Sequence, residues 1–194
     1  AFAVLMSVDV LLVRTWFSPE VSGRFAQAAT LGRMILWLPL PIANAMFPKV
    51  VRTGASSSEH RKTALAAVAY TMALTLIALG LAWGLAPLGF FLVYGIADVP
   101  PAQITWLRQV ALAMTPLAPL HVWMHYELAR GSIRRLTPIL LGAAVFLTLA
   151  ALRHRDIGQV IQALQLATLT ALVGSVAVLV FRKRISERGY LMDK

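Results

Sequence analysis

The sequence contains no cysteine, and it is poor in charged residues. Only 13% of its 194 residues are charged, whereas about a quarter are charged in an ordinary soluble domain. Without cysteine there is no disulfide framework, no thiolate nucleophile and no Cys-based metal site. The sequence also lacks a Ser/His/Asp set, a phosphate-cradling glycine loop and paired carboxylates, which leaves hydrolysis and nucleotide binding without support. We therefore expect neither an enzyme nor a cofactor.

Hydrophobic residues are abundant instead. They make up 59% of the chain, and the mean hydropathy is +0.73, which indicates an integral membrane protein. The net charge of +10 does not indicate a nucleic-acid partner, because the basic residues lie in short connectors between apolar blocks. A nucleic-acid-binding face would gather them together with aromatic residues.

The first residues, AFAVLMSVDVLLV, are apolar from the outset. They include no initiator Met, no basic n-region and no small-residue cleavage site, so they do not resemble a signal peptide. We expect a segment of a longer polypeptide whose first helix is cut near its start.

Six apolar blocks are long enough to predict membrane crossings, which need about 20 residues each. The predicted fold is an all-α integral membrane lobe of six transmembrane helices that occupies residues 1–194 as one domain. The predicted helices are 1–16, 24–48, 63–86, 104–127, 136–152 and 158–181.

The basic residues predict the orientation of these helices. Twelve of the 18 Lys and Arg lie in the connectors 49–62 and 130–135 and in the tail from Arg182. By the positive-inside rule this side is cytoplasmic, so the first helix runs outward and the C-terminus lies in the cytoplasm. Aromatic residues at both predicted interfaces agree, with Trp16, Trp83 and Trp106 outside and Phe47, Trp123, Tyr126 and Phe181 inside. The predicted location is the cell membrane, and membrane lipids are the predicted surroundings.

Small residues and an interrupted connector predict finer features. Gly80 and Gly84 form a GxxxG pair, and Ala167, Ala171 and Ser175 recur every four residues. Both patterns favour close helix packing. The outer connector 87–101 is apolar but interrupted by Gly and Pro, which predicts either a short amphipathic interfacial element or a plain loop.

Arg33 is the leading candidate for function. It lies inside a predicted crossing, where a guanidinium costs roughly 2.5 to 3.5 kcal/mol on translocon-based scales. If the segment is α-helical throughout, Asn44 lies about 20° and Trp37 about 40° from Arg33 around the axis, which makes one polar and aromatic face. The guanidinium suits phosphate or pyrophosphate because it donates in a bidentate fork. We predict substrate binding by Arg33, Asn44 and Trp37.

Asp9 offers an alternative role for Arg33, because the two residues have similar predicted depths on neighbouring helices. It is a predicted counter-ion or ion-coupling site, since intramembrane carboxylates often mark ion pathways. Prolines 39, 41, 116 and 119 remove backbone hydrogen bonds, and either permit bending or are tolerated in a static bundle.

Two further sets of polar residues, the histidines near residue 121 and the glutamines near residue 159, each have a structural and a functional interpretation. His121 and His125, with Glu127 nearby, faintly resemble a metal pair, but they lack a third ligand and favour an interfacial hydrogen-bonding cluster. We predict no metal site. Gln159, Gln162 and Gln165 either line a wet groove or make interhelical hydrogen bonds.

The segment from Val8 to Val50 resembles the polysaccharide biosynthesis proteins, or oligosaccharide flippases, of the MOP superfamily. The matching residues are Asp9, Gly23, Phe25, Gly32, Arg33, Leu38, Pro39, Phe47 and Pro48, followed later by Tyr94, Gly95, Ala129, Gly131 and Arg134.

This resemblance implies the C-terminal six-helix lobe of a two-lobed transporter, whose partner is an N-terminal lobe of the same chain. It also implies flipping of a lipid-linked sugar pyrophosphate across the cytoplasmic membrane by alternating access, as part of polysaccharide biosynthesis for the cell envelope. Arg33 fits the role of the cavity cation that engages the pyrophosphate. The alternatives are an ion-coupled drug or metabolite antiporter of the same superfamily and a membrane-embedded glycosyl- or acyltransferase.

Overall fold

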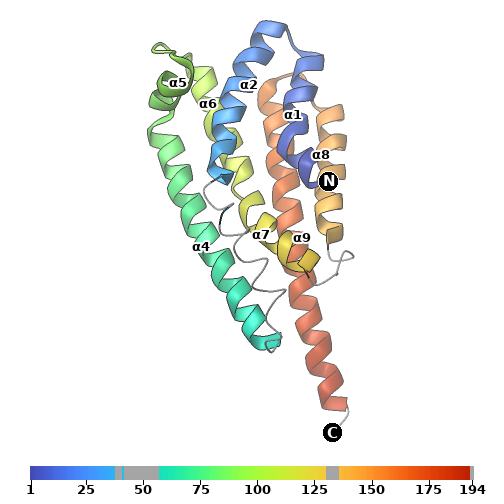
Figure 1. Ribbon diagram of the computed structural model, residues 1–194. Helices are drawn as coiled ribbons and strands as arrows, with labels where there is room; N and C mark the ends of the chain where they lie inside the picture. The colour runs from blue at the N-terminus through green and yellow to red at the C-terminus, as the bar shows by residue number, and fades with distance from the viewer. Residues whose placement is uncertain (38–40, 42–56, 130–135, 193–194) are drawn as a thin grey trace.

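The computed structural model describes residues 1–37, 41, 57–129 and 136–192, and all elements within these ranges are helical. The predicted all-α class is confirmed. Most helices run roughly along one axis, and α5 lies at one end (Figure 1). The α1–α2, α5–α6 and α8–α9 connectors lie at that same end, as the predicted alternation of crossings requires.

The first two helices begin and end for local reasons. Helix α1 spans Phe2–Trp16, in agreement with the predicted 1–16. Helix α2 spans Pro19–Arg33 and starts earlier than predicted, because Ser18 is extended and a proline follows it in the first turn. The chain continues as the 3₁₀ helix η1, Met34–Leu36.

The predicted continuous helix 24–48 is therefore interrupted after Arg33; Pro41 is again helical, and residues 38–40 and 42–48 lie outside the described ranges. Two prolines follow shortly after η1. Pro39 and Pro41 lack the N–H groups that would bond to the Ile35 and Trp37 carbonyls, so two hydrogen bonds of a continuous α-helix cannot form.

Proline also marks two other helix breaks, one of them inside a predicted helix. Helix α4 spans Ser57–Gly84 and is followed by α5, Ala86–Tyr94, where Pro87 occupies the first turn. The predicted helix 104–127 is two helices, α6 at Pro101–Met114 and α7 at Leu117–Ala129. They are separated by a turn at Thr115 and Pro116, because Pro116 cannot donate to the Leu112 carbonyl.

The connector 87–101 contains most of α5, so it is not a plain loop. Both faces of α5 are apolar: Ala86 and Phe90 are buried, while Leu88, Phe91 and Leu92 are exposed. The short helix is thus present but is not amphipathic. It ends at Gly95, whose φ of 69° is left-handed and favours glycine.

The last two helices form an antiparallel pair. Helix α8 spans Thr137–Leu152, close to the predicted 136–152. Helix α9 spans Ile157–Met192 and passes well beyond the predicted end at residue 181. Its extension contains Arg, Lys and Glu, which are good helix formers, and it projects away from the other helices (Figure 1).

Small residues bring α8 and α9 together. A Cβ on Gly142 would lie 2.8 Å from the Ala167 carbonyl oxygen and 2.8 Å from Ala171 Cβ. Ala167, Ala171 and Ser175 are all buried, so their predicted packing role is confirmed. The prediction for Gly80 and Gly84 is wrong for the described residues, because both are exposed and a Cβ on either would meet nothing within 4 Å.

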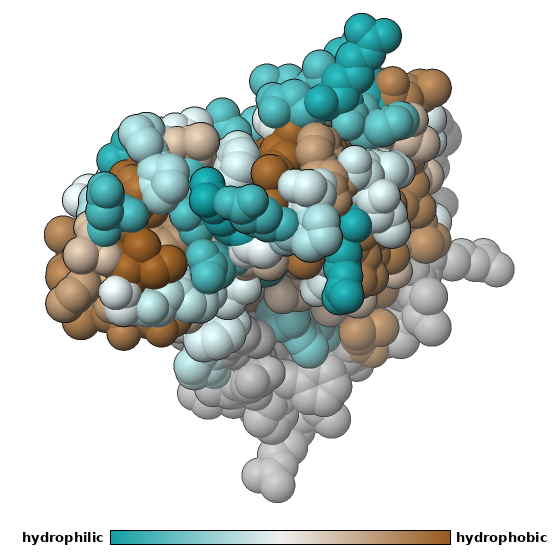
Figure 2. Space-filling model, turned by 90° about the horizontal axis from the view of Figure 1, so that it is seen from above, coloured by the Kyte–Doolittle hydropathy of each residue, from teal (hydrophilic) through white to brown (hydrophobic). Residues whose placement is uncertain are grey.

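The main core lies where α1, α2, α6, α8 and α9 meet. Its fully buried side chains include Leu5, Phe25, Met114, Phe146 and Leu164. Many large apolar side chains nevertheless remain exposed on the sides of the bundle, among them Tyr70, Ile77, Leu140, Leu152 and Val173. From above, hydrophilic residues cover much of the end, and hydrophobic residues appear along its margins (Figure 2).

Two helices among the described residues are long and apolar enough to cross a membrane, by length and composition. They are Leu65–Gly84, with 20 residues, and Ile157–Val178, with 22 residues. Thr137–Leu152 is apolar but shorter. The six predicted crossings are thus not all shown, because α1, α2, α6, α7 and α8 each have only 13 to 16 residues.

Candidate functional site

The structure brings Asp9 and Arg33 together although they are 24 positions apart in the chain. Arg33 Nη2 donates a hydrogen bond to Asp9 Oδ1 and forms an ion pair with it. The side chain of Asp9 is 1% exposed, and that of Arg33 is 15% exposed. The ion-pair alternative considered from the sequence is thus present between α1 and α2.

This ion pair leaves polar capacity unused. Among the described residues, the buried atoms Asp9 Oδ2 and Arg33 Nε have no hydrogen-bond partner. A guanidinium has five donor hydrogens, so one contact with Asp9 does not exhaust it. A second anionic group would satisfy donors that the carboxylate does not reach.

Helix α2 is held in its register by contact with α6. A Cβ on Gly32 would lie 3.0 Å from the Leu107 carbonyl oxygen, 3.0 Å from Val110 Cγ1 and 3.1 Å from Ala111 N. Only a glycine lets the two backbones approach this closely without a shift. Because Arg33 follows directly, the tight contact on one side of α2 directs the guanidinium toward α1 on another.

Two side-chain hydrogen bonds also join α2 and α6, farther toward the N-terminal end of α2. Gln103 Nε2 of α6 donates to Gln27 Oε1 at 2.9 Å and to the Arg24 carbonyl at 3.2 Å. Gln103 is 2% exposed. Gln103 was not predicted from the sequence, and the signal that was available is a glutamine in the first turn of α6.

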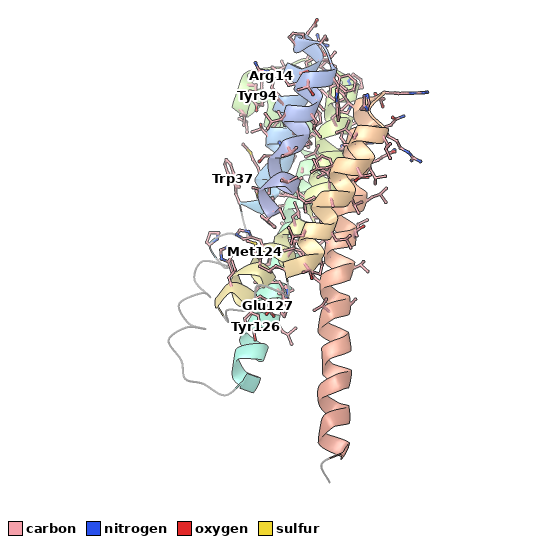
Figure 3. The ribbon with its side chains drawn as sticks, turned by 90° about the vertical axis from the view of Figure 1, so that its right-hand side faces the viewer. Arg14, Trp37, Tyr94, Met124, Tyr126 and Glu127 are labelled. Carbon is pink, nitrogen blue, oxygen red and sulfur yellow. The ribbon has the colours of Figure 1, made fainter. Side chains whose placement is uncertain are left out.

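Trp37 lies at the turn after η1 and is 60% exposed. In Figure 3 its side chain extends from the lower end of α2. The expected 40° between Arg33 and Trp37 assumed an α-helix, whereas a 3₁₀ helix turns about 120° per residue. Their shared face therefore does not follow from spacing. Asn44 lies outside the described residues, and the binding roles of both residues stay predictions.

The histidines on α7 contact each other. His121 Nε2 and His125 Nε2 are 3.1 Å apart, and the two rings meet edge to face with centroids 4.5 Å apart. Phe2 lies against His121 at a centroid distance of 5.1 Å. In the part of the chain that the structure describes, no three His, Cys, Asp or Glu side chains are arranged to hold a metal ion.

Glu127 and Tyr126, at the end of α7, are buried at 1% and 4% exposure. Tyr126 packs with Ala67 of α4, and in Figure 3 both labelled side chains lie near the lower part of that helix. Trp123 lies beside Tyr126 at a centroid distance of 5.3 Å. This arrangement agrees with the hydrogen-bonding and aromatic cluster predicted for this end of the bundle.

The three glutamines of α9 divide between the two interpretations. Gln165 Nε2 donates to the Gln109 carbonyl of α6 at 3.1 Å, which is an interhelical hydrogen bond. Gln159 and Gln162 instead line a groove of about 360 Å³ beside the α8–α9 turn. A second, apolar groove of about 280 Å³ lies between α2, α4 and α5. Neither groove has Asp9 or Arg33 in its lining.

Comparisons with protein families, with curated proteins and with solved structures find no match to this chain. The family resemblance of the segment that contains Asp9 and Arg33 therefore stays a prediction.

Proposed function

We propose that this chain crosses the cell membrane six times and forms the C-terminal lobe of a MOP-type transporter. The proposed activity is flipping of a lipid-linked sugar pyrophosphate by alternating access, in partnership with an N-terminal lobe. The all-α fold, the alternation of connectors and the exposed apolar sides of the bundle support the membrane placement. Helices such as α1 and α8 are short for a bilayer and would cross it with their flanking turns.

The Asp9–Arg33 ion pair is the observation that carries the proposal. Burying two charges costs free energy that a structural pair of apolar residues would avoid. Apolar and small residues and hydrogen bonds such as Gln103–Gln27 hold the rest of the bundle, so a functional role explains a buried charged pair better than packing does.

The proposed mechanism exchanges one anion for another at Arg33. In the resting state the guanidinium is neutralised by Asp9. When the pyrophosphate of the substrate enters the space between the two lobes, its oxygens replace the Asp9 carboxylate and accept hydrogen bonds from the Arg33 guanidinium, including the Nε that Asp9 leaves unused. Asp9 then serves as the counter-ion that receives Arg33 again after release.

A transport assay on the complete two-lobed protein tests this role. Reconstituted vesicles would be loaded with a fluorescent polyprenyl-pyrophosphate oligosaccharide, and the fraction that a membrane-impermeant quencher reaches would be followed over time. Arg33→Lys keeps the charge but loses the planar fork, so we expect transport to fall at least about tenfold while the protein still folds. Arg24→Lys is the matched control, because Arg24 is exposed on the same helix.

Two results would argue against the proposal. Full transport by a folded Arg33→Ala protein would remove Arg33 from the mechanism. Efflux of a soluble cation without any lipid movement would favour the antiporter alternative, in which Asp9 is the coupling site. The enzyme alternative has less support, since its candidate histidines, His121 and His125, contact each other, and His121 also packs against Phe2.

A further inference from the structure

The groove beside the α8–α9 turn combines a cationic rim with an apolar floor. It has a volume of about 360 Å³ and is lined by Leu149, Leu152, Arg153, Arg155, Gln159, Gln162, Ala163 and Leu166. In the sequence the two arginines bear only on the predicted topology. Their convergence with two glutamines appears only when α8 and α9 are paired.

The rim of the groove carries hydrogen-bond donors and positive charge, which suit an anion. Arg153 and Arg155 are exposed and bring two guanidiniums to one groove. Gln159 Oε1 accepts a hydrogen bond from the backbone N–H of Arg155 at 3.3 Å. The NH₂ group of the Gln159 side chain is therefore the part that can donate to a ligand. Gln162 adds a second amide, and this one is exposed.

The other polar side chains of the turn, Asp156 and His154, make contacts outside the groove. Asp156 Oδ2 accepts the N–H of Gly158 at 3.1 Å, and Asp156 is not part of the groove lining. The His154 ring stacks on Trp16 of α1 at a centroid distance of 4.6 Å, and its Nδ1 lies 2.9 Å from the Ala151 carbonyl. These contacts hold the middle of the turn and leave the flanking arginines to face the groove.

An apolar stripe continues from the groove along α9. Gln162, Leu166, Leu169, Val173 and Val176 are all exposed, and their spacing of three and four residues places them on one face of the helix. The fourteen steps from Gln162 to Val176 cover about 21 Å at 1.5 Å per residue. Half of a bilayer's hydrocarbon core is about 15 Å thick, so the stripe is long enough to follow an acyl chain from headgroup level to the midplane.

We propose that this groove binds an anionic phospholipid from the membrane leaflet at this end of the bundle. Its phosphate lies between Arg153 and Arg155 with Gln162 as a further donor, and one acyl chain follows Leu166, Leu169 and Val173. The proposal depends on the membrane placement argued above, but it does not depend on flipping. Charge selects the ligand, because two guanidiniums with no lining carboxylate favour a net negative headgroup over a zwitterionic one.

Native mass spectrometry of the protein in detergent, with added phosphatidylglycerol, tests the proposal. We expect the unmodified protein to retain phosphatidylglycerol in preference to phosphatidylcholine. Arg153→Gln with Arg155→Gln should lower the apparent affinity for phosphatidylglycerol at least about tenfold, the effect of losing one charge-assisted hydrogen bond. Arg14→Gln with Arg24→Gln removes the same charge at the same end of the bundle but outside the groove, and should leave retention unchanged.

Each alternative has its own signature. If both double variants lose the same affinity for phosphatidylglycerol, the effect is one of general charge and the proposed site is overturned. Equal retention of phosphatidylcholine and phosphatidylglycerol by the unmodified protein would also overturn it. A third outcome is that inorganic phosphate displaces phosphatidylglycerol while the Leu166→Asn variant retains phosphatidylglycerol unchanged. That result would assign the two arginines to a free phosphate ion and would overturn the proposed lipid site. Arg153→Lys with Arg155→Lys is a second variant that keeps the charge and should keep the preference for phosphatidylglycerol.

The measurement involves no transport step. Loss of the lipid site would therefore leave the proposed flipping intact, and absence of flipping would leave the lipid result intact.

Discussion

Arg108 of α6 donates a hydrogen bond to the backbone carbonyl of Trp83 of α4, with 2.8 Å between Nη2 and the oxygen. The position of this carbonyl, four residues before a proline, explains why it needs a donor from another helix. In a continuous α-helix the Trp83 oxygen would accept the N–H of residue 87, but that residue is Pro87 and has no N–H. The guanidinium supplies the donor that proline withholds, and it thereby ties α6 to the break between α4 and α5.

Arg108→Gln should therefore destabilise the protein by leaving the carbonyl without this partner. We expect a loss of about 1 to 3 kcal/mol in the free energy of unfolding. The loss should shrink when Pro87→Ala is also present, because the new N–H can bond to Trp83 itself. Denaturant unfolding in detergent micelles measures the cycle, and equal losses in both backgrounds would refute the explanation. Arg14→Gln, which removes an exposed charge at the same end, is the control.

Arg33→Ala should destabilise the folded protein because it leaves the carboxylate of Asp9 buried without its partner. Breaking a buried pair from one side costs about 3 to 5 kcal/mol. Arg33→Ala with Asp9→Ala should recover much of that loss, since neither charge then remains. The coupling is obtained from the unfolding free energies of the single and double variants. Additive losses would mean that the two side chains do not stabilise each other.

Gly32→Ala should weaken the contact between α2 and α6. The new methyl group would lie 3.0 Å from the Leu107 carbonyl oxygen, which is backbone and cannot rotate away. We expect a cost of about 1 to 3 kcal/mol. Gly23→Ala on the same helix is the matched control: its Cβ meets nothing within 4 Å, and replacing a helical glycine should stabilise by about 0.5 to 1 kcal/mol. Thermal unfolding distinguishes the pair, and equal shifts would contradict the close approach.

The proposed orientation is accessible to cysteine labelling because the chain has no cysteine of its own. In intact cells, Ala97→Cys should react with an impermeant thiol reagent, whereas Ser57→Cys should react only after permeabilisation. Ala97 is exposed in the α5–α6 connector, and Ser57 begins α4 at the other end. Ser22 would be a poor reporter, since it is buried and donates a hydrogen bond to the Val13 carbonyl. Labelling of Ser57→Cys from outside would reverse the orientation.

The helical class and most helix positions follow from the sequence because they depend on local properties. Long apolar blocks, separated by turns with charged or small residues, have few ways to satisfy their backbone except as helices. Residues such as Trp16 and Leu152 end helices within a residue of their predicted ends. Pro39, Pro41, Pro87 and Pro116 also signalled breaks, but sequence alone did not show whether each would bend, end or divide a helix.

The contacts between helices required the tertiary structure. Gly32 and Gly80 are both glycines in apolar segments, yet only Gly32 lies against another backbone. The sequence placed Asp9 and Arg33 at similar depths, but their pairing depends on how α1 and α2 rotate about their axes. Arg153 and Arg155 likewise become parts of one groove only through the close packing of α8 on α9. Periodicity defines the faces of one helix, and which faces meet is decided by packing many helices at once.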